Sequence, residues 1–258
     1  MRIGVLTGGG DVPGLNSVIK SVVYRSTELG GQVLGIRRGW EGLTHPRPGK
    51  DPDAEYVRPL DRLNTRSIDR TGGTVLHTSR TNPRRMKKER LPAHVTPDEL
   101  AHLANADGTY DLTQVVVDNI AGLGLDHLVV IGGDDTISFA EVLAQKGVRL
   151  VAIPKTMDND VQGTEYCVGF STAITRAMDL IDRQRTTLGS HERIGIFRVF
   201  GSCRHSPSQR PDQTAVFFQA ILNGSFVFAG NSMKNRFSHS VYSFGKKSLN
   251  FVLNYFIS

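Results

Sequence analysis

Two short apolar runs in the middle of the chain, at residues 128–131 and 150–153, are continuous rather than alternating. Runs of this kind are typical of parallel strands that are buried on both faces of a sheet. The segment between them, residues 136–147, has the length and apolar spacing of a helix and closes at a glycine. This stretch therefore predicts a strand–helix–strand unit.

The same pattern extends along the rest of the chain. It predicts further strands at residues 2–7, 32–36 and 193–200. It predicts further helices at residues 15–29, 111–123 and 168–187. Residues 45–70 are rich in Pro and Arg, and we expect them to form excursions over the surface. Strands that alternate with helices predict an α/β fold, with a mostly parallel sheet and helices on both faces.

Acidic residues follow both central strands. Gly132 and Gly133 lead to Asp134 after the first strand, and Asp158 and Asp160 follow the second. Ligands bind at the carboxyl ends of strands in open α/β sheets. Glycine amides suit a bulky anion, one carboxylate suits Mg²⁺, and another can accept a hydroxyl proton. These positions favour phosphoryl transfer over the alternative that acidic residues here only cap helices and form turns.

A third candidate loop, Gly8-Gly9-Gly10-Asp11, lies between the first strand and its helix. A glycine turn at this place is suited to anions, because free amides and the helix dipole face the loop. Its spacing matches neither the dinucleotide-binding motif nor the Walker A motif. By itself, the loop is a weak indication of phosphate binding.

Composition is that of a globular protein, with 258 residues, 39% hydrophobic and 22% charged. The two cysteines, Cys167 and Cys203, provide no disulfide framework and are typical of a reducing cytoplasm. We expect neither a membrane span nor a signal peptide. Most of the net charge of +6 lies in residues 202–258, so the nearly neutral body argues against nucleic acid as a partner.

Five motifs occur in one order along the chain: Gly8-Gly-Gly-Asp-Val-Pro-Gly-Leu-Asn16, Gly72-Gly-Thr with Ser79-Arg80, Gly132-Gly-Asp-Asp-Thr, Pro154-Lys-Thr-Met-Asp-Asn-Asp, and Ser190-His-Glu-Arg. Over about residues 1–201 the chain thereby resembles the phosphofructokinase family. The resemblance implies a phosphoryl-donor-binding α/β domain at 1–160 and the start of a sugar-phosphate domain at 161–201. It also implies a cytoplasmic homo-oligomer, either a dimer or a tetramer.

The resemblance also assigns roles to individual residues. Asp158 is the implied base for the sugar hydroxyl, and the implied sugar-phosphate contacts are Thr156, Met157, Asp158 and, toward a neighbouring subunit, Arg193. The implied donor phosphate contacts are Gly10, Arg80 and Gly133, and the implied Mg²⁺ ligands are Asp134 and Asp160. Asp135 and Lys155 resemble the pyrophosphate-dependent branch, because ATP-dependent members typically carry glycine at both positions.

The function expected from this resemblance is phosphoryl transfer from pyrophosphate to fructose 6-phosphate, giving fructose 1,6-bisphosphate. An ATP-dependent phosphofructokinase is the alternative donor assignment. NAD and lipid kinases also use Gly-Gly-Asp-Gly loops, but they lack the Pro-Lys-Thr-Met-Asp-Asn-Asp element at this distance. An alternative of another class is a non-catalytic fragment that binds phosphate compounds or pairs with an intact homologue.

The character of the sequence changes after Gly201. Residues 202–258 contain eight of the twelve Phe and a single acidic residue, Asp212. The family normally continues with a substrate-contacting arginine at the place of Ser202. We expect an altered reading frame or read-through, which leaves a disordered or non-native tail and an incomplete second domain. The alternative is a real variant segment. Because a later segment completes the first domain in the family, we also expect an unfinished sheet edge.

Overall fold

The structure is a computed structural model that describes residues 1–46, 55–96, 102–157, 159, 161 and 163–192. It also describes two short strands, Ile196–Phe197 and Val227–Phe228. The chain divides into two compact units, Met1–Ala173 and Ile174–Ser258. The predicted domain limits at residues 160 and 201 stay predictions, and the predicted tail lies outside the described residues apart from its two-residue strand.

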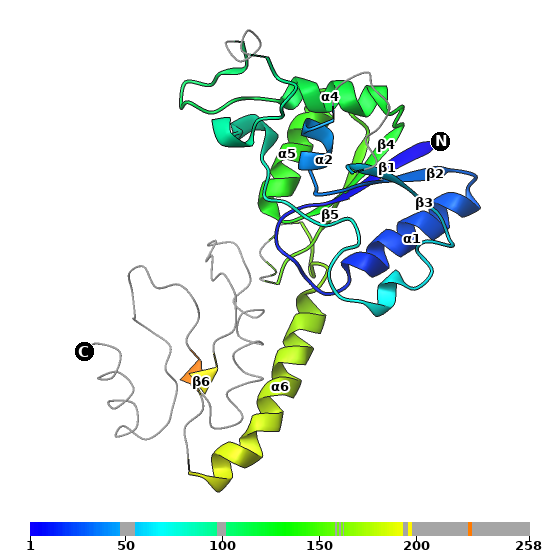
Figure 1. Cartoon of the computed structure of the whole chain (residues 1–258). Helices are drawn as coiled ribbons and strands as arrows, with labels where there is room; N and C mark the ends of the chain where they lie inside the picture. The colour runs from blue at the N-terminus through cyan, green and yellow to red at the C-terminus, as the bar shows by residue number, and fades with distance from the viewer. Residues whose placement is uncertain are drawn as a thin grey trace. The chain divides into compact units, whose positions relative to one another are not determined.

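Five strands form the sheet of the first unit, in the order β3-β2-β1-β4-β5 (Figure 1). Their bounds are β1 Arg2–Thr7, β2 Gln32–Ile36, β3 Val57–Leu60, β4 His127–Gly132 and β5 Leu150–Pro154. All neighbouring strands are parallel except β2 and β3, which are antiparallel. The carboxyl ends of β1, β4 and β5 therefore lie next to one another at one end of the sheet.

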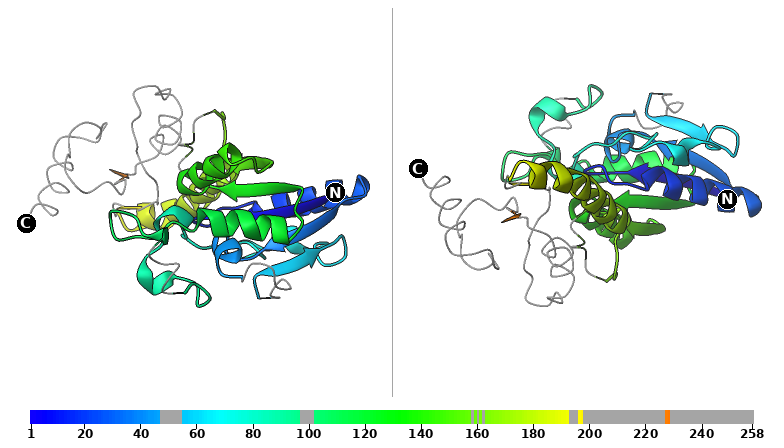
Figure 2. Two further views of the ribbon diagram at one scale, coloured as in Figure 1. Left: turned by 90° about the horizontal axis from the view of Figure 1, so that it is seen from above. Right: turned by 90° about the horizontal axis from the view of Figure 1, so that it is seen from below.

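The helices of the first unit cover both faces of this sheet (Figures 1 and 2). Their bounds are α1 Leu15–Glu28, α2 Glu41–Thr44, α4 Thr113–Gly122 and α5 Asp134–Gln145. Short 3-10 turns lie at Ile68–Arg70, Pro83–Arg85 and Lys88–Arg90. The longer helix α6, Phe170–Ser190, crosses the limit between the two units. Among the described helices, none is both long enough and apolar enough to span a membrane.

Two apolar clusters hold the layers together, one on each face of the sheet. On one face, Leu15 and Ile19 of α1 pack with Val5 of β1. On the other, Phe139 of α5 packs with Val130 of β4 and with other side chains from α2 and α4. Alternate residues of the central strands enter opposite clusters, as expected for strands buried on both faces. The predicted α/β fold, with a mostly parallel sheet and helices on both faces, is confirmed.

Two expectations about the sheet were wrong. Residues 45–70 include β3, because Val57 and Leu60 are buried against β2. Pro59 suits this edge position, since it has no N–H to donate to a ladder. The run at 150–153 is not buried on both faces, because β5 is the other edge strand of the sheet and Val151 is 59% exposed. A continuous apolar run does not distinguish a central strand from an edge strand.

The second unit contains a described parallel strand pair. This pair joins β6, Ile196–Phe197, to β7, Val227–Phe228, with Ile196 opposite Val227. The strand expected at 193–200 includes β6, and its other residues lie outside the described part of the chain.

Candidate functional site

Eight of the predicted site residues lie in the described part of the chain, around the carboxyl ends of β1, β4 and β5. They are Gly10, Arg80, Gly133, Asp134, Asp135, Lys155, Thr156 and Met157. The other three, Asp158, Asp160 and Arg193, lie outside the described residues, and their roles stay predictions.

Lys155 is the central cation of this site. It directly follows β5 and is only 4% exposed. Its backbone N–H donates to the Gly132 carbonyl at 3.0 Å, and its Nζ donates to the Gly10 carbonyl at 2.5 Å. A Cβ added to Gly9 would lie 3.2 Å from Nζ, and one added to Gly133 would lie 4.0 Å away. The ammonium group thus lies between the glycine loops that follow β1 and β4.

The surroundings of this ammonium group disfavour its charge. Burial lowers the pKa of Lys155, the carboxylate of Asp11 opposes that shift, and the positive charge of Arg80 adds to it. Arg80 itself is exposed. A buried charge is stabilised by an opposite charge brought next to it. An anionic ligand between the glycine loops would therefore relieve an existing electrostatic cost.

Packing requires glycine at some positions of the two loops and not at others. A Cβ on Gly8 would lie 2.7 Å from Thr136 Oγ1, and one on Gly132 would lie 2.3 Å from Thr136 Cβ. These two glycines let the first turn of α5 approach the sheet. At Gly10, by contrast, the place of a Cβ is open, because no atom of a described residue other than its two chain neighbours lies within 4 Å. Close packing within the chain explains Gly8 and Gly132 but gives no reason for glycine at position 10.

Asp134 and Asp135 form the first turn of α5, with Gly133 as the N-cap residue. The expectation that they lie in a loop after the strand was wrong, because the helix begins two residues earlier than its apolar pattern indicates. Carboxylates are stabilised in a first helical turn by the free amides and the helix dipole. Both side chains are exposed, so a solvent-accessible acidic pair stands beside the glycine loop after β4.

The segment before Arg80 supports the first glycine loop. The Gly9 N–H donates to the Ser79 carbonyl at 3.1 Å, and the Thr78 hydroxyl donates to the Gly9 carbonyl at 2.7 Å. The sequence motifs include Ser79 but did not indicate these contacts. The available signal was the concentration of hydroxyl residues at positions 74, 78, 79 and 81, shortly after two glycines.

Thr156 and Met157 continue the chain beyond Lys155. The Thr156 N–H donates to the Val168 carbonyl at 3.3 Å, which ties this loop to the start of α6. Met157 is partly buried and packs against the cluster formed with α1. Asn159 follows with a positive φ of 52°, and its side-chain oxygen accepts from the Cys167 N–H at 2.8 Å. Sugar-phosphate contacts by Thr156 and Met157 stay predictions.

The site combines a buried ammonium, two glycine loops and a helix amino terminus that carries two carboxylates. Cations and backbone amides bind phosphate oxygens, and a carboxylate with phosphate oxygens is the ligand set that Mg²⁺ prefers. Within the described residues, no three His, Cys, Asp or Glu side chains gather as a metal cluster. Asp134 is the predicted metal ligand that the structure describes.

Comparisons of sequence and fold relate this chain to known proteins. The phosphofructokinase family profile matches residues 2–205. A pyrophosphate–fructose 6-phosphate 1-phosphotransferase of Amycolatopsis mediterranei is 39% identical over 207 residues, which are 80% of this chain and 51% of that protein. An ATP-dependent 6-phosphofructokinase of Streptomyces coelicolor is 38% identical over 209 residues, with the same two shares. This chain thus spans about half the length of these relatives.

The fold is similar to that of a solved phosphofructokinase. The structure of the Saccharomyces cerevisiae enzyme matches with a TM-score of 0.57 and 26% identity, over 80% of this chain and 26% of that one. The motifs, the loops at the carboxyl ends of β1, β4 and β5, and these matches lead to one conclusion. The chain belongs to the phosphofructokinase family.

Proposed function

We propose that this chain takes part in phosphoryl transfer from pyrophosphate to fructose 6-phosphate, giving fructose 1,6-bisphosphate. The observation that carries the donor assignment is the buried Lys155 between the two glycine loops. Relatives of similar identity are named for pyrophosphate and for ATP, so the choice between donors rests on the residues of the site. The family resemblance adds a cytoplasmic homo-oligomer to this proposal.

Lys155 and Asp135 favour the smaller donor for different reasons. The ammonium of Lys155 is a compact point charge, which suits a small and highly charged anion. Asp135 adds bulk and negative charge at the start of α5, where ATP would have to place the phosphate that carries its nucleoside. A like charge at that place selects against ATP. Pyrophosphate carries no nucleoside and avoids this conflict.

The remaining roles follow the family resemblance. Gly10, Gly133 and Arg80 contact the donor phosphates, and the contacts to the sugar phosphate come from Thr156, Met157 and Arg193. Asp158 accepts the proton of the sugar hydroxyl. Asp134, an exposed carboxylate beside Gly133, fits Mg²⁺ together with Asp160. When bound, Mg²⁺ offsets the negative charge of the transferred group.

A coupled assay with each donor tests this proposal on the purified chain, with and without Mg²⁺. We expect turnover with pyrophosphate above that with ATP. Replacing Asp158 with Ser should abolish turnover while substrate binding, measured by isothermal titration calorimetry, largely survives. Near-normal turnover of Asp158→Ser would contradict its role as the base.

A second candidate is a phosphate-binding chain without turnover. The observation that favours it is the buried Lys155 between the two glycine loops, which accounts for anion binding without a transfer step. Its signature is calorimetric binding of pyrophosphate with no product formed from either donor. Size-exclusion chromatography of the chain, alone and mixed with an intact relative, then tests whether it pairs with a complete enzyme.

A further inference from the structure

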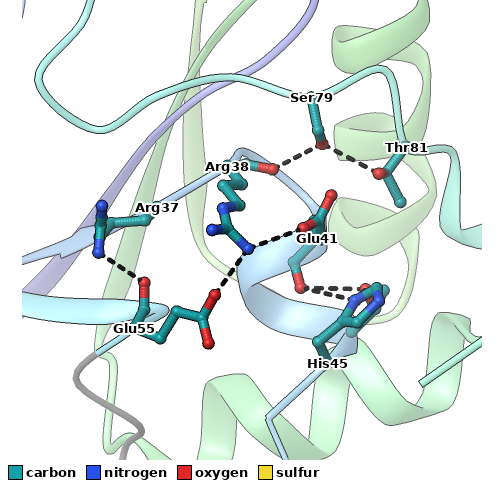
Figure 3. Close-up of polar contacts among 8 residues, drawn as sticks. Arg37, Arg38, Glu41, His45, Glu55, Ser79 and Thr81 are labelled. Carbon is teal, nitrogen blue, oxygen red and sulfur yellow. Dashed lines mark hydrogen bonds and ion pairs between the residues drawn. The ribbon is translucent and has the colours of Figure 1, made fainter. Parts of the chain in front are cut away.

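The side chain of Ser79 contacts the loop after β2 and a hydroxyl group of its own segment (Figure 3). Its hydroxyl donates to the Arg38 carbonyl at 2.6 Å. The Thr81 hydroxyl oxygen lies 2.9 Å from Ser79 Oγ. Ser79 has a single hydroxyl proton, so with that proton on Arg38 the Thr81 hydroxyl is the donor to Ser79. Arg80 stands between these two linked residues.

The backbone of Ser79 is held as well, because its carbonyl accepts from the Gly9 N–H at 3.1 Å. Arg80 is therefore preceded by a residue fixed to the loop after β1 and to the loop after β2. The Arg80 side chain is exposed, and the residue before it is bonded to Gly9, where an added Cβ would lie 3.2 Å from Lys155 Nζ. We propose that Ser79 is a positioning residue that holds Arg80 in place for the donor phosphates, an inference that rests on the proposed function.

Arg38, whose carbonyl accepts from the Ser79 hydroxyl, is itself held by several contacts. Arg38 has a positive φ of 58°, which is uncommon for a residue other than glycine. Its N–H donates to the Leu76 carbonyl at 2.8 Å. Its guanidinium pairs with Glu55 at 2.9 Å and with Glu41 at 3.5 Å (Figure 3). Partial burial lowers the pKa of Arg38, but attraction by Glu55 and then Glu41 outweighs this effect and raises that pKa overall.

The segment that leads to Ser79 also contains a residue with a positive φ. His77 also has a positive φ, 56°, and its carbonyl accepts from the buried Thr7 hydroxyl at 2.9 Å. Backbone strain persists only where the surroundings determine it, and it gathers at ligand sites. Two strained residues thus flank the glycine loop after β1. Such a scaffold lowers the backbone entropy that the segment around Arg80 loses when the arginine binds an anion.

Calorimetric titration of the 258-residue chain with pyrophosphate and Mg²⁺ tests this role. We expect Ser79→Ala to weaken pyrophosphate binding about three- to ten-fold, since it removes the side-chain bonds to Arg38 and Thr81 and leaves only the Gly9 bond to hold the backbone before Arg80, without removing a phosphate contact. Ser79→Thr retains the hydroxyl and should restore binding. The matched control is Ser21→Ala, which removes a hydroxyl that also donates to a backbone carbonyl, at 2.9 Å within α1. This control should leave binding unchanged.

A double-mutant cycle separates positioning from a general structural role. If Ser79 acts through Arg80, Ser79→Ala should change binding less than two-fold in an Arg80→Ala background. An equal loss in both backgrounds, or no loss in the wild-type background, would overturn the inference. If Ser79→Ala does not fold, Thr81→Val gives the same cycle with the Arg38 bond left intact.

The outcomes also distinguish this inference from the proposed function. A wild-type chain that binds no pyrophosphate refutes the donor site and this inference together. An Arg80→Ala variant that binds pyrophosphate normally refutes the Arg80 contact and, with it, this inference. Binding that Arg80→Ala weakens and Ser79→Ala leaves unchanged refutes the inference alone.

Discussion

Replacing Lys155 with Met separates the stability of the fold from its affinity for the donor. Met keeps the length and the apolar stem of the side chain but removes the ammonium group. The wild-type ammonium donates to the Gly10 carbonyl at 2.5 Å and is buried between the glycine loops. We expect the variant to retain the stability of the wild type and to lose most of its affinity for pyrophosphate.

The stability argument weighs two opposing effects. Losing a hydrogen bond from a charged group ordinarily costs about 1.5–3 kcal/mol. Against that loss, burial lowers the pKa of Lys155, so the folded state holds its charge less favourably than the unfolded chain does. Gly10 is exposed, so water can replace the lost donor at its carbonyl. We therefore expect the free energy of unfolding to stay within about 1 kcal/mol of the wild-type value or to rise.

For binding, the change can only lower the affinity for pyrophosphate. At least one charge-assisted bond to a phosphate oxygen disappears, which costs about 1.5–3 kcal/mol and raises Kd about ten- to 150-fold. Urea unfolding measures the free energy of unfolding, and calorimetric titration with pyrophosphate at fixed salt measures Kd. The matched control is Lys146→Met, the same change at the exposed C-cap of α5. An unfolding free energy lowered by more than about 2 kcal/mol, with pyrophosphate binding intact, would refute the reasoning and make Lys155 a structural residue.

Three further predictions concern the same site. Because the pKa of Lys155 is lowered below its ordinary 10.5, the unfolded chain binds more protons between the two values, and stability should rise with pH across that window. Urea unfolding at stepped pH should show this rise in the wild type and its absence in Lys155→Met. Gly10→Ala should keep a free energy of unfolding within about 0.5 kcal/mol of the wild-type value, because the place of its Cβ is open. The same variant should weaken pyrophosphate binding, measured by calorimetry, about ten-fold. Unchanged binding would show that Gly10 is not part of the site. Asp135→Gly, alone and with Lys155→Gly, should raise ATP use and lower pyrophosphate use in coupled assays, and a parent chain that already prefers ATP would contradict the donor assignment.

The sequence predicted the central elements well, because burial on both faces leaves a clear apolar run. The limits of β1 agree with the prediction at both ends, since a buried run follows the exposed Arg2 and stops at a glycine. The helix α5 was predicted from its apolar face, but its start was missed. Its first turn holds Asp134 and Asp135, and carboxylates are generally favoured there by free amides, which a hydrophobic pattern does not report.

Features that depend on distant contacts were not predictable in this way. The position of β5 at a sheet edge depends on the order of the strands, which the run at 150–153 does not contain. The Lys155 ammonium donates to the carbonyl of Gly10, a residue 145 positions away. The Ser79 hydroxyl similarly meets Arg38 across 41 positions. Local patterns and the family resemblance together named the residues of the site, but the tertiary fold gives them their environment.

Packing requires glycine at positions 8 and 132 but not at position 10, and this difference matters for the evolution of related sequences. Gly8 and Gly132 are held by the packing of Thr136, so a copy that had abandoned its chemistry would still need them in order to fold. Packing does not require glycine at position 10, because an added methyl group would find open space there. Genetic drift in an inactive lineage should therefore erase this glycine early while sparing the other two. Among duplicated or shortened copies, the residue at position 10 becomes a marker of whether selection still maintains the anion site.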